Sequence, residues 1–213
     1  MKILFSNYSF GAGIATDLVN TSALVWTSTG EVLTDPPALA RFLDEHEARL
    51  DALPRGALPT GTDLAQVLAL RQETRALLEA GHEDEVAEGA NELAARASAA
   101  PTLLRDPDGK WEWHVATDPR ASVADELGAL VGVGLLGVLH TLSHARFRHC
   151  ASPVCAGMFI DTSKAGRRRY CMPGLCGNRL NVANHRARRQ GSEARPENGD
   201  ANGDRSGSGT GSR

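Results

Sequence analysis

The four cysteines of the chain all lie between residues 150 and 176 and form two pairs of equal spacing. Four residues separate Cys150 from Cys155, fifteen follow, and four again separate Cys171 from Cys176. Thiol pairs spaced by two to four residues are typical of a tetrahedral zinc site with four cysteine ligands. Because no cysteine stands outside the pairs, zinc is favoured over unrelated or disulfide-bonded cysteines. We expect one structural Zn²⁺ held by all four, with no open coordination position for catalysis.

Size and apolar segments place the chain in a broad class. Its 213 residues, 41% of them hydrophobic, suffice for one moderate domain and a small module. The N-terminal apolar run is three residues long, too short for the core of a secretory signal. The stretch Leu127–Leu139 is shorter than the roughly 20 residues that span a bilayer. We expect a cytoplasmic protein without a membrane segment, and a reducing cytoplasm favours metal thiolates over disulfides.

Charge is distributed unevenly along the chain. Between Arg146 and Gln190, nine arginines and one lysine face a single acid, Asp161, which gives a formal charge of +9. The other residues carry 13 basic and 25 acidic side chains, a balance of −12. Four thiolates around Zn²⁺ contribute about −2, which leaves the cysteine segment at about +7. A basic module on an acidic body predicts an anionic partner, above all nucleic acid; the other interpretation is a basic surface that complements the acidic body.

Apolar spacing before the cysteines predicts a helical domain over residues 1–145. Proline and capping residues mark where several of its helices begin, and glycine marks where one ends. Helices are expected within 15–19, over 34–50 with Thr34 or Asp35 as the cap, from 62 to about 81, over 83–99 and over 121–144.

A change of period between the last two helices predicts a small hairpin, with strands 102–105 and 111–115 around a turn at 106–109. Trp111, Trp113 and Val115 alternate with polar residues, which predicts that one face of this hairpin is buried. The fold class is therefore mainly α with a small β-hairpin.

Two motifs in the last helix of this domain resemble functional sites. Gly132, Gly134 and Gly137 match G-x-G-x-x-G, but they lie inside an apolar helical run, and not at a junction of strand and helix. We interpret the small residues there as positions of close helix packing. His140 and His144 are four residues apart but lack the intervening glutamate of a zinc protease. We expect them to be polar residues near a helix end, where an imidazolium suits the helix dipole.

The cysteine segment, residues 146–190, predicts a small ββα-like zinc finger. Residues 159–161 form a short strand and 167–171 return from a turn at 162–166, so that a hairpin separates the two thiol pairs. Metal binding must supply much of the folding energy of so small a module. A helix is expected from Cys176 to about Gln190, with its positive end near the Cys176 thiolate. Residues 191–213 have almost no apolar side chains, and we expect a disordered tail.

Arginine side chains dominate the surface of the predicted finger. Guanidinium groups suit phosphate oxygens and guanine edges. We expect nucleic-acid contacts from Arg167, Arg168, Arg186, Arg188 and Arg189. Gly177, Asn178 and Arg179 directly follow the last cysteine, and we expect Arg179 to offset the charge of the metal centre or to form a hydrogen bond within the module.

The tetrapeptide Cys176-Gly177-Asn178-Arg179 resembles the motif for which the CGNR zinc finger family is named. The likeness extends from Cys150 to about Arg189 and includes Phe159-x-Asp161, with Tyr170 where the family commonly has tryptophan. Leu18-Val19-Asn20-Thr21 resembles an early motif of the ABATE-type helical domain that accompanies this finger. The resemblance implies a stress-induced bacterial transcriptional regulator whose finger binds DNA and whose helical domain senses a small-molecule ligand or a protein partner.

The leading hypothesis is a non-enzymatic, zinc-dependent DNA-binding regulator, with RNA in place of DNA as a variant of the same hypothesis. The alternative is a protein-interaction or redox-responsive zinc module that loses its metal when the thiolates oxidise. An enzyme built on the helical domain is a third class, for which the sequence offers no recognisable group of serine, histidine and acid. A homodimer through the helical domain would give this small finger a second contact with DNA.

Overall fold

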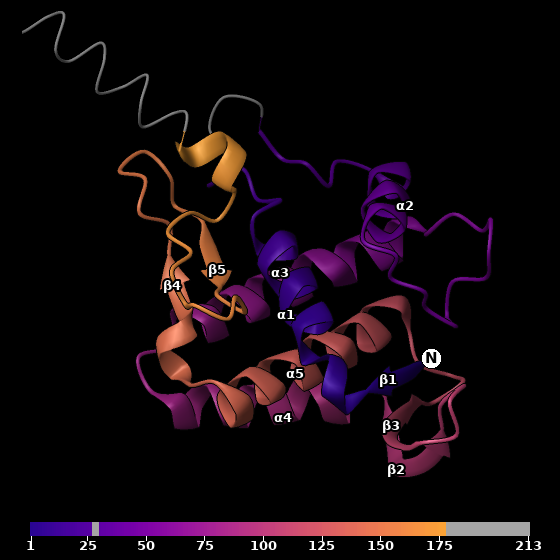
Figure 1. Ribbon diagram of the computed structural model, residues 1–213. Coiled ribbons are helices and arrows are strands. Elements are labelled where there is room, and N and C mark those ends of the chain that lie inside the picture. The colour runs from indigo at the N-terminus through magenta and orange to yellow at the C-terminus, as the bar shows by residue number, and fades with distance from the viewer. Residues whose placement is uncertain (27–29, 178–213) are drawn as a thin grey trace, which may run out of the picture.

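The apolar segment after Ser122 forms the central helix, α5 (Val123–Thr141), of the computed structural model, which describes residues 1–26 and 30–177 (Figure 1). A capping box of Ser122 and Asp125 satisfies backbone groups at its first turn. By length and composition α5 is apolar enough to cross a membrane, but 67% of its apolar window is buried within the protein. It is a core helix, surrounded by α1 (Tyr8–Val19), α3 (Gly61–Glu79) and α4 (Glu83–Ala95).

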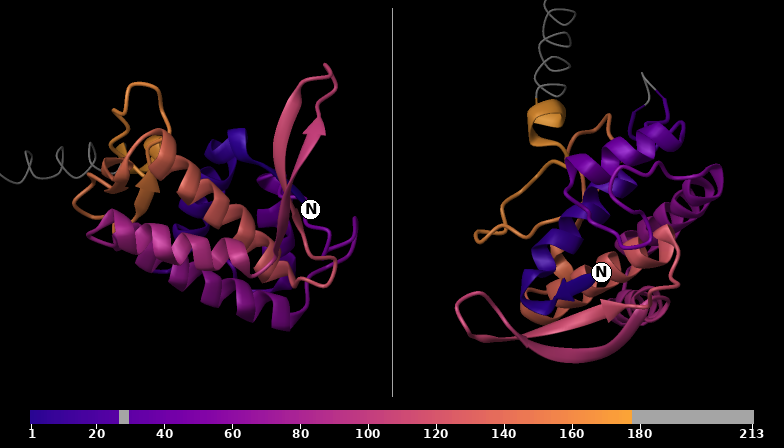
Figure 2. Two further views of the ribbon diagram at one scale, coloured as in Figure 1. Left: turned by 90° about the horizontal axis from the view of Figure 1, so that it is seen from below. Right: turned by 90° about the vertical axis from the view of Figure 1, so that its right-hand side faces the viewer.

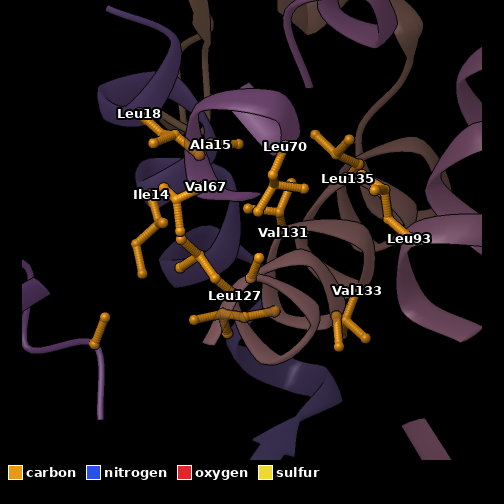
Figure 3. Close-up of a cluster of buried hydrophobic side chains, with 14 of the residues drawn as sticks. Ile14, Ala15, Leu18, Val67, Leu70, Leu93, Leu127, Val131, Val133 and Leu135 are labelled. Carbon is orange, nitrogen blue, oxygen red and sulfur yellow. The ribbon is translucent and has the colours of Figure 1, made fainter. Parts of the chain in front are cut away.

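Aliphatic side chains from these four helices make one continuous core (Figure 3). Burying a leucine or valine fully contributes about 1.5 to 3 kcal/mol, so such a cluster supplies most of the favourable folding free energy. Its fully or almost fully buried members include Ile14 and Leu18 of α1, Val67 and Leu70 of α3, Leu93 of α4, and Leu127, Val131 and Leu135 of α5.

Glycines let α5 approach its neighbours at backbone distance. A Cβ atom on Gly132 would lie 2.6 Å from the carbonyl oxygen of Ala90 in α4, and one on Gly134 would lie 2.5 Å from the backbone of Gly11 in α1. Both distances are too short for a side chain, so these positions require glycine. The interpretation of the G-x-G-x-x-G match as helix packing is confirmed.

Capping decides where the helices begin and end. Asp35 accepts a hydrogen bond from the Ala38 backbone N–H and starts α2 (Pro36–Glu45), as expected. The helix ends earlier than the predicted residue 50, because Glu47 adopts a positive φ of 53° and the Ala48 N–H bonds back to the Leu43 carbonyl. α4 also ends before the predicted residue 99, in this case because the chain enters a strand at Ser98.

The predicted hairpin is present as part of a three-stranded antiparallel sheet. Its strands are β2 (Ser98–Arg105) and β3 (Trp111–Thr117), and β1 (Lys2–Leu4) pairs with the other edge of β3. Sequence reasoning missed β1, because three residues are too few to show a period. A 3₁₀ turn, η1 (Phe5–Asn7), joins β1 to α1.

The prediction of a buried tryptophan face on this hairpin is wrong. Val115 is 4% exposed, whereas Trp111 and Trp113 are 57% and 56% exposed. The hairpin projects beyond the helical body, so that only the part of β3 near Val115 reaches the core (Figure 2). Arg105 lies over Trp111, with its guanidinium carbon 4.1 Å from the ring centroid, which covers part of one indole.

The cysteine module lies at the opposite end of the helical body from this sheet (Figures 1 and 2). A 3₁₀ turn, η2 (His144–Arg146), leads into β4 (Phe147–His149), which pairs antiparallel with β5 (Met158–Ile160). The fold class of a mainly α protein with small antiparallel β elements is confirmed.

Two details of the predicted finger differ from the structure. The strand partner of β5 is β4 and not residues 167–171, because the backbone of 168–169 instead bonds to the Asp161 carboxylate and to Ala151. The first thiol pair therefore lies within the hairpin loop. The last helix begins at residue 173, three residues before Cys176, and is described to residue 177. The rest of that predicted helix and the predicted disordered tail lie outside the described residues.

Replacing both exposed tryptophans by alanine should cost about 1 kcal/mol or less of unfolding free energy, because each tryptophan stays more than half exposed in the folded protein. Leu93→Ala, which leaves a cavity between α4 and α5, should cost about 2 to 5 kcal/mol. Urea denaturation followed by circular dichroism measures both. A double tryptophan variant as unstable as Leu93→Ala would contradict the exposed position of this face.

Candidate metal centre

The four cysteine side chains, far apart in pairs along the chain, converge on one point. All four Sγ atoms lie within 4.8 Å of one another, and no disulfide joins them. The Sγ of Cys171 is 3.5 Å from that of Cys155 and 3.6 Å from that of Cys176, while Cys155 and Cys176 are 3.7 Å apart. A tetrahedral zinc with Zn–S bonds of about 2.3 Å places its sulfurs about 3.8 Å apart. The cluster therefore fits Zn²⁺ in size, ligand type and number.

Backbone hydrogen bonds hold three of the four cysteines at this point. The Cys150 N–H donates to the Gly157 carbonyl at 2.8 Å, which closes the loop that carries the first pair. The Cys155 N–H donates to the Ser152 carbonyl at 3.1 Å within that loop. In the second pair, the Cys176 N–H donates to the Met172 carbonyl at 2.8 Å in the helical turn 173–177.

Burial and N–H donors shift the pKa values of the thiols in opposite directions. Burial raises the pKa of the Cys171 and Cys176 thiols. Burial acts on Cys150 as well, but N–H donors that include the Cys171 backbone bring its pKa below the ordinary value. Zinc binding must therefore displace protons from the Cys171 and Cys176 thiols, and the affinity for zinc is expected to fall as the pH is lowered.

Asp161, the single acid of the module, organises the surrounding loops and was given no role by sequence reasoning. Its fully buried carboxylate accepts hydrogen bonds from the N–H and hydroxyl of Ser163, from the Arg168 N–H at 3.0 Å and from Arg148 at 3.2 Å. Burial favours the neutral acid, but these bonds and the Arg148 charge lower the pKa of Asp161 below its ordinary value. The signal that could have identified it is its isolation among ten basic residues.

Several arginines of the module point inward as supports. Arg146 donates to the carbonyl oxygens of Asp161 and Ser163, and Arg148 donates to that of Gly166. Arg168, which sequence reasoning assigned to nucleic acid, donates to the carbonyls of Tyr170 and Cys171 and lies 4.9 Å over the Phe159 ring. The polar contacts of the Arg168 side chain are therefore with the backbone of the module itself.

The other predicted contact residues divide into exposed and undescribed ones. Arg167 is exposed, as are Lys164 and Arg169, and the Arg169 guanidinium carbon is 5.7 Å from the Tyr170 ring centroid. Gly177 ends the described turn and lies beside Tyr170. Asn178, Arg179, Arg186, Arg188 and Arg189 lie outside the described residues, so their expected roles stay predictions.

His140, near the end of α5, and His144, in η2, lie away from the metal centre. His144 hydrogen-bonds to the Ala80 carbonyl and stacks on Phe147, while His140 is exposed. Phe147 packs against the main core, whereas Phe159 and Tyr170 pack around the thiols. Within the described ranges, the cysteine cluster is the group placed to hold a metal ion.

Comparison with known families agrees with this geometry. Residues 146–189 match the CGNR zinc finger family, and residues 13–143 match a family described as putative stress-induced transcription regulator. The second match covers more than half of the chain. No curated protein matches the chain. The resemblances carried by residues 176–179 and 18–21 are confirmed, and together with the cysteine cluster they support a structural zinc.

Freshly reduced protein should contain about one zinc per chain, and removing it with a chelator should lower the melting temperature. A ligand that binds the folded state at about 1,000 times its Kd stabilises it by about 4 kcal/mol. Metal analysis and thermal denaturation measure the two effects. Cys171→Ser is the control, since it should lose both the metal and the chelator response. Less than about half a zinc per wild-type chain would contradict the site.

Asp161→Asn should destabilise the zinc-loaded protein by about 3 kcal/mol, because an amide nitrogen replaces an oxygen that accepts buried hydrogen bonds and Arg148 loses its anionic partner. The carboxylate has a lowered pKa, so its contribution is present above the ordinary aspartate range and is lost as the pH falls below it. Chemical denaturation of the zinc-loaded proteins at pH 7, where the thiolates keep the metal, measures the difference. A variant as stable as the wild type would refute the assigned role.

Proposed function

The chain belongs to the ABATE family of putative stress-induced transcription regulators, and we propose that it is a regulator whose zinc module binds DNA directly. The observation that carries the proposal is that the basic side chains of the module fall into two groups, one bonded within the module and one exposed. Arg146, Arg148 and Arg168 turn inward and support it, whereas Lys164, Arg167 and Arg169 are exposed. We name the segment 162–169 the basic loop.

The basic loop has a fixed form, which suits recognition of a regular polyanion. The Asp161 carboxylate holds Ser163 at one end and the Arg168 backbone at the other, while Arg146 and Arg148 bond to carbonyls within it. The loop therefore need not be ordered when a partner binds, which reduces the entropic cost of association. Exposed guanidinium groups carried by this held backbone can each pair with a phosphate or a guanine edge.

The balance of charge also favours nucleic acid. The module's formal charge of +9 stands against −12 on the remaining residues, so the field of the protein orients the module and not the body toward a polyanion. Four thiolates complete the zinc coordination shell, which favours a structural role of the metal over a catalytic one. Arg186, Arg188 and Arg189 are proposed as further contacts.

We further propose that the helical body senses an effector. A cleft of about 730 Å³ lies beside α2 and offers apolar side chains together with charges of both signs. Such a lining suits a small amphipathic molecule. Its walls include Leu43, Asp44, Leu50, Arg55 and Leu58.

Binding of the zinc-loaded protein to duplex DNA should weaken steeply with salt. Each phosphate contact contributes about −0.9 to the slope of log K against log salt concentration. Replacing Lys164, Arg167 and Arg169 together by alanine should lower the affinity and reduce that slope by up to about 3. Fluorescence anisotropy with a labelled duplex, from 50 to 300 mM salt, measures both quantities.

The matched control removes one lysine and two arginines from the body, as Lys110→Ala, Arg41→Ala and Arg120→Ala, which are exposed positions outside the module. It should leave the slope nearly unchanged. Competition with single-stranded and duplex RNA separates the DNA proposal from its RNA variant. Equal loss of affinity in both triple variants, or a salt-independent affinity, would count against the basic loop as the DNA-binding surface.

A further inference from the structure

The segment Ala156–Met158, which links the first thiol pair to β5, is held by side chains from two different helices of the body. Asn20, at the C-terminal end of α1, is 3% exposed, and its amide brackets the backbone of Met158. Asn20 Nδ2 donates to the Met158 carbonyl at 2.6 Å, and the Met158 N–H donates to Asn20 Oδ1 at 3.1 Å. The amide thus pairs with Met158 as a neighbouring strand would.

A second side chain of α1 extends this pairing. Thr16, one turn before Asn20, accepts a hydrogen bond from the Ile160 N–H at 3.0 Å through its hydroxyl. The Thr16 hydroxyl in turn donates to the Ala12 carbonyl, which fixes its direction. One edge of β5 is therefore paired with β4, while polar side chains of a helix satisfy backbone groups on either side of Phe159.

The held segment is in direct contact with the metal centre. The Gly157 N–H donates to Cys155 Sγ at 3.3 Å, and the Gly157 carbonyl accepts from the Cys150 N–H at 2.8 Å. A Cβ atom on Gly157 would lie 2.5 Å from Cys171 Sγ and 2.8 Å from Asn20 Oδ1. Gly157 is thus enclosed between a metal-ligating sulfur and the Asn20 amide, with no room for a side chain. A shift of Asn20 would displace the N–H that serves Cys155.

The second helix acts on the same segment from α3. Arg75, whose side chain is 18% exposed, donates through Nη2 to the Ala156 carbonyl at 2.9 Å. The same guanidinium pairs with Glu79, one turn later in α3, at 2.7 Å. α1 and α3 therefore hold adjacent peptide units, at Met158 and at Ala156, on the two sides of Gly157.

We propose that Asn20 and Arg75 are positioning residues of the zinc centre, so that the helical body, and not the finger alone, sets the affinity for the metal. Outer-shell partners orient metal ligands, and their loss commonly lowers metal affinity by about 10- to 100-fold. The proposal goes beyond DNA binding and rests on the zinc site alone. A rearrangement of α1 relative to α3 changes the two contacts unequally and is transmitted to the thiol ligands.

The test measures zinc affinity of full-length variants in the absence of nucleic acid, by competition with a chromophoric chelator. Asn20→Ala and Arg75→Gln should each weaken zinc binding by about 10- to 100-fold. Arg75→Lys, which keeps a cationic donor, should restore part of the loss. The absorption bands of Co²⁺ bound in place of zinc report the ligand geometry and should shift in Asn20→Ala.

Two controls separate positioning from general stability. Leu93→Ala destabilises the helical core without touching the module and should lower the melting temperature but leave zinc affinity and the Co²⁺ spectrum unchanged. Arg96→Gln removes a surface arginine that pairs with Glu73, away from the metal centre, and should have no effect on either. Arg75→Gln, a change at a partly buried position outside the aliphatic core, keeps the test informative if Asn20→Ala fails to fold.

Zinc affinity and a Co²⁺ spectrum that stay at wild-type values in both Asn20→Ala and Arg75→Gln would overturn the proposal. The proposal would also be overturned if both variants lowered the melting temperature as Leu93→Ala does but left metal binding unchanged. Because no DNA is present, this result does not depend on whether the protein binds DNA. A failure of the positioning proposal likewise leaves the DNA proposal untouched.

Discussion

The three residues of β5 connect the metal centre to the helical core, and the arrangement of the protein depends on that connection. Side chains alternate along a strand, so neighbours point to opposite faces. Met158 and Ile160 are buried in the main core, while Phe159 is buried among the cysteines. One short strand therefore belongs to two cores at once. This explains how a module with little apolar surface of its own takes a fixed position on the body.

Electrostatics in the module follows from having one acid among ten basic residues. A buried carboxylate is costly unless it is fully hydrogen-bonded, and Asp161 meets this condition by drawing in Arg148 and the Ser163 and Arg168 backbone. The arginines nearest Asp161 and the thiolates are consequently used for support. Those left exposed on the basic loop are the ones whose charge a polyanion can reach. The same sequence feature thus produces both a rigid loop and a cationic surface.

Features that depend on local spacing were predictable from the sequence. The pairing of the cysteines and the Asp35 cap rest on neighbours a few residues away, and Gly132 and Gly134 could be assigned to helix packing because they lie within a local apolar helical run. Features that depend on distant partners were not predictable. The alternation of Trp111 and Trp113 resembles that of a buried strand, but no helix lies beneath that end of the hairpin. Asn20 could be noticed only as part of a motif, because its partner is 138 residues away.

Binding equilibria at two connected sites are reciprocal, and the shared strand makes this relevant to zinc. If zinc loss loosens the thiol loops, the contacts of Asn20 with Met158 and of Arg75 with Ala156 weaken with them. Asn20 precedes Thr21, which accepts from Arg71, and Arg71 holds Glu31 in the loop before α2. An effector that tightens the contact between α1 and α3 would therefore raise zinc affinity, and zinc would raise the affinity for that effector by the same factor. A finger joined by a flexible linker would show no such reciprocity.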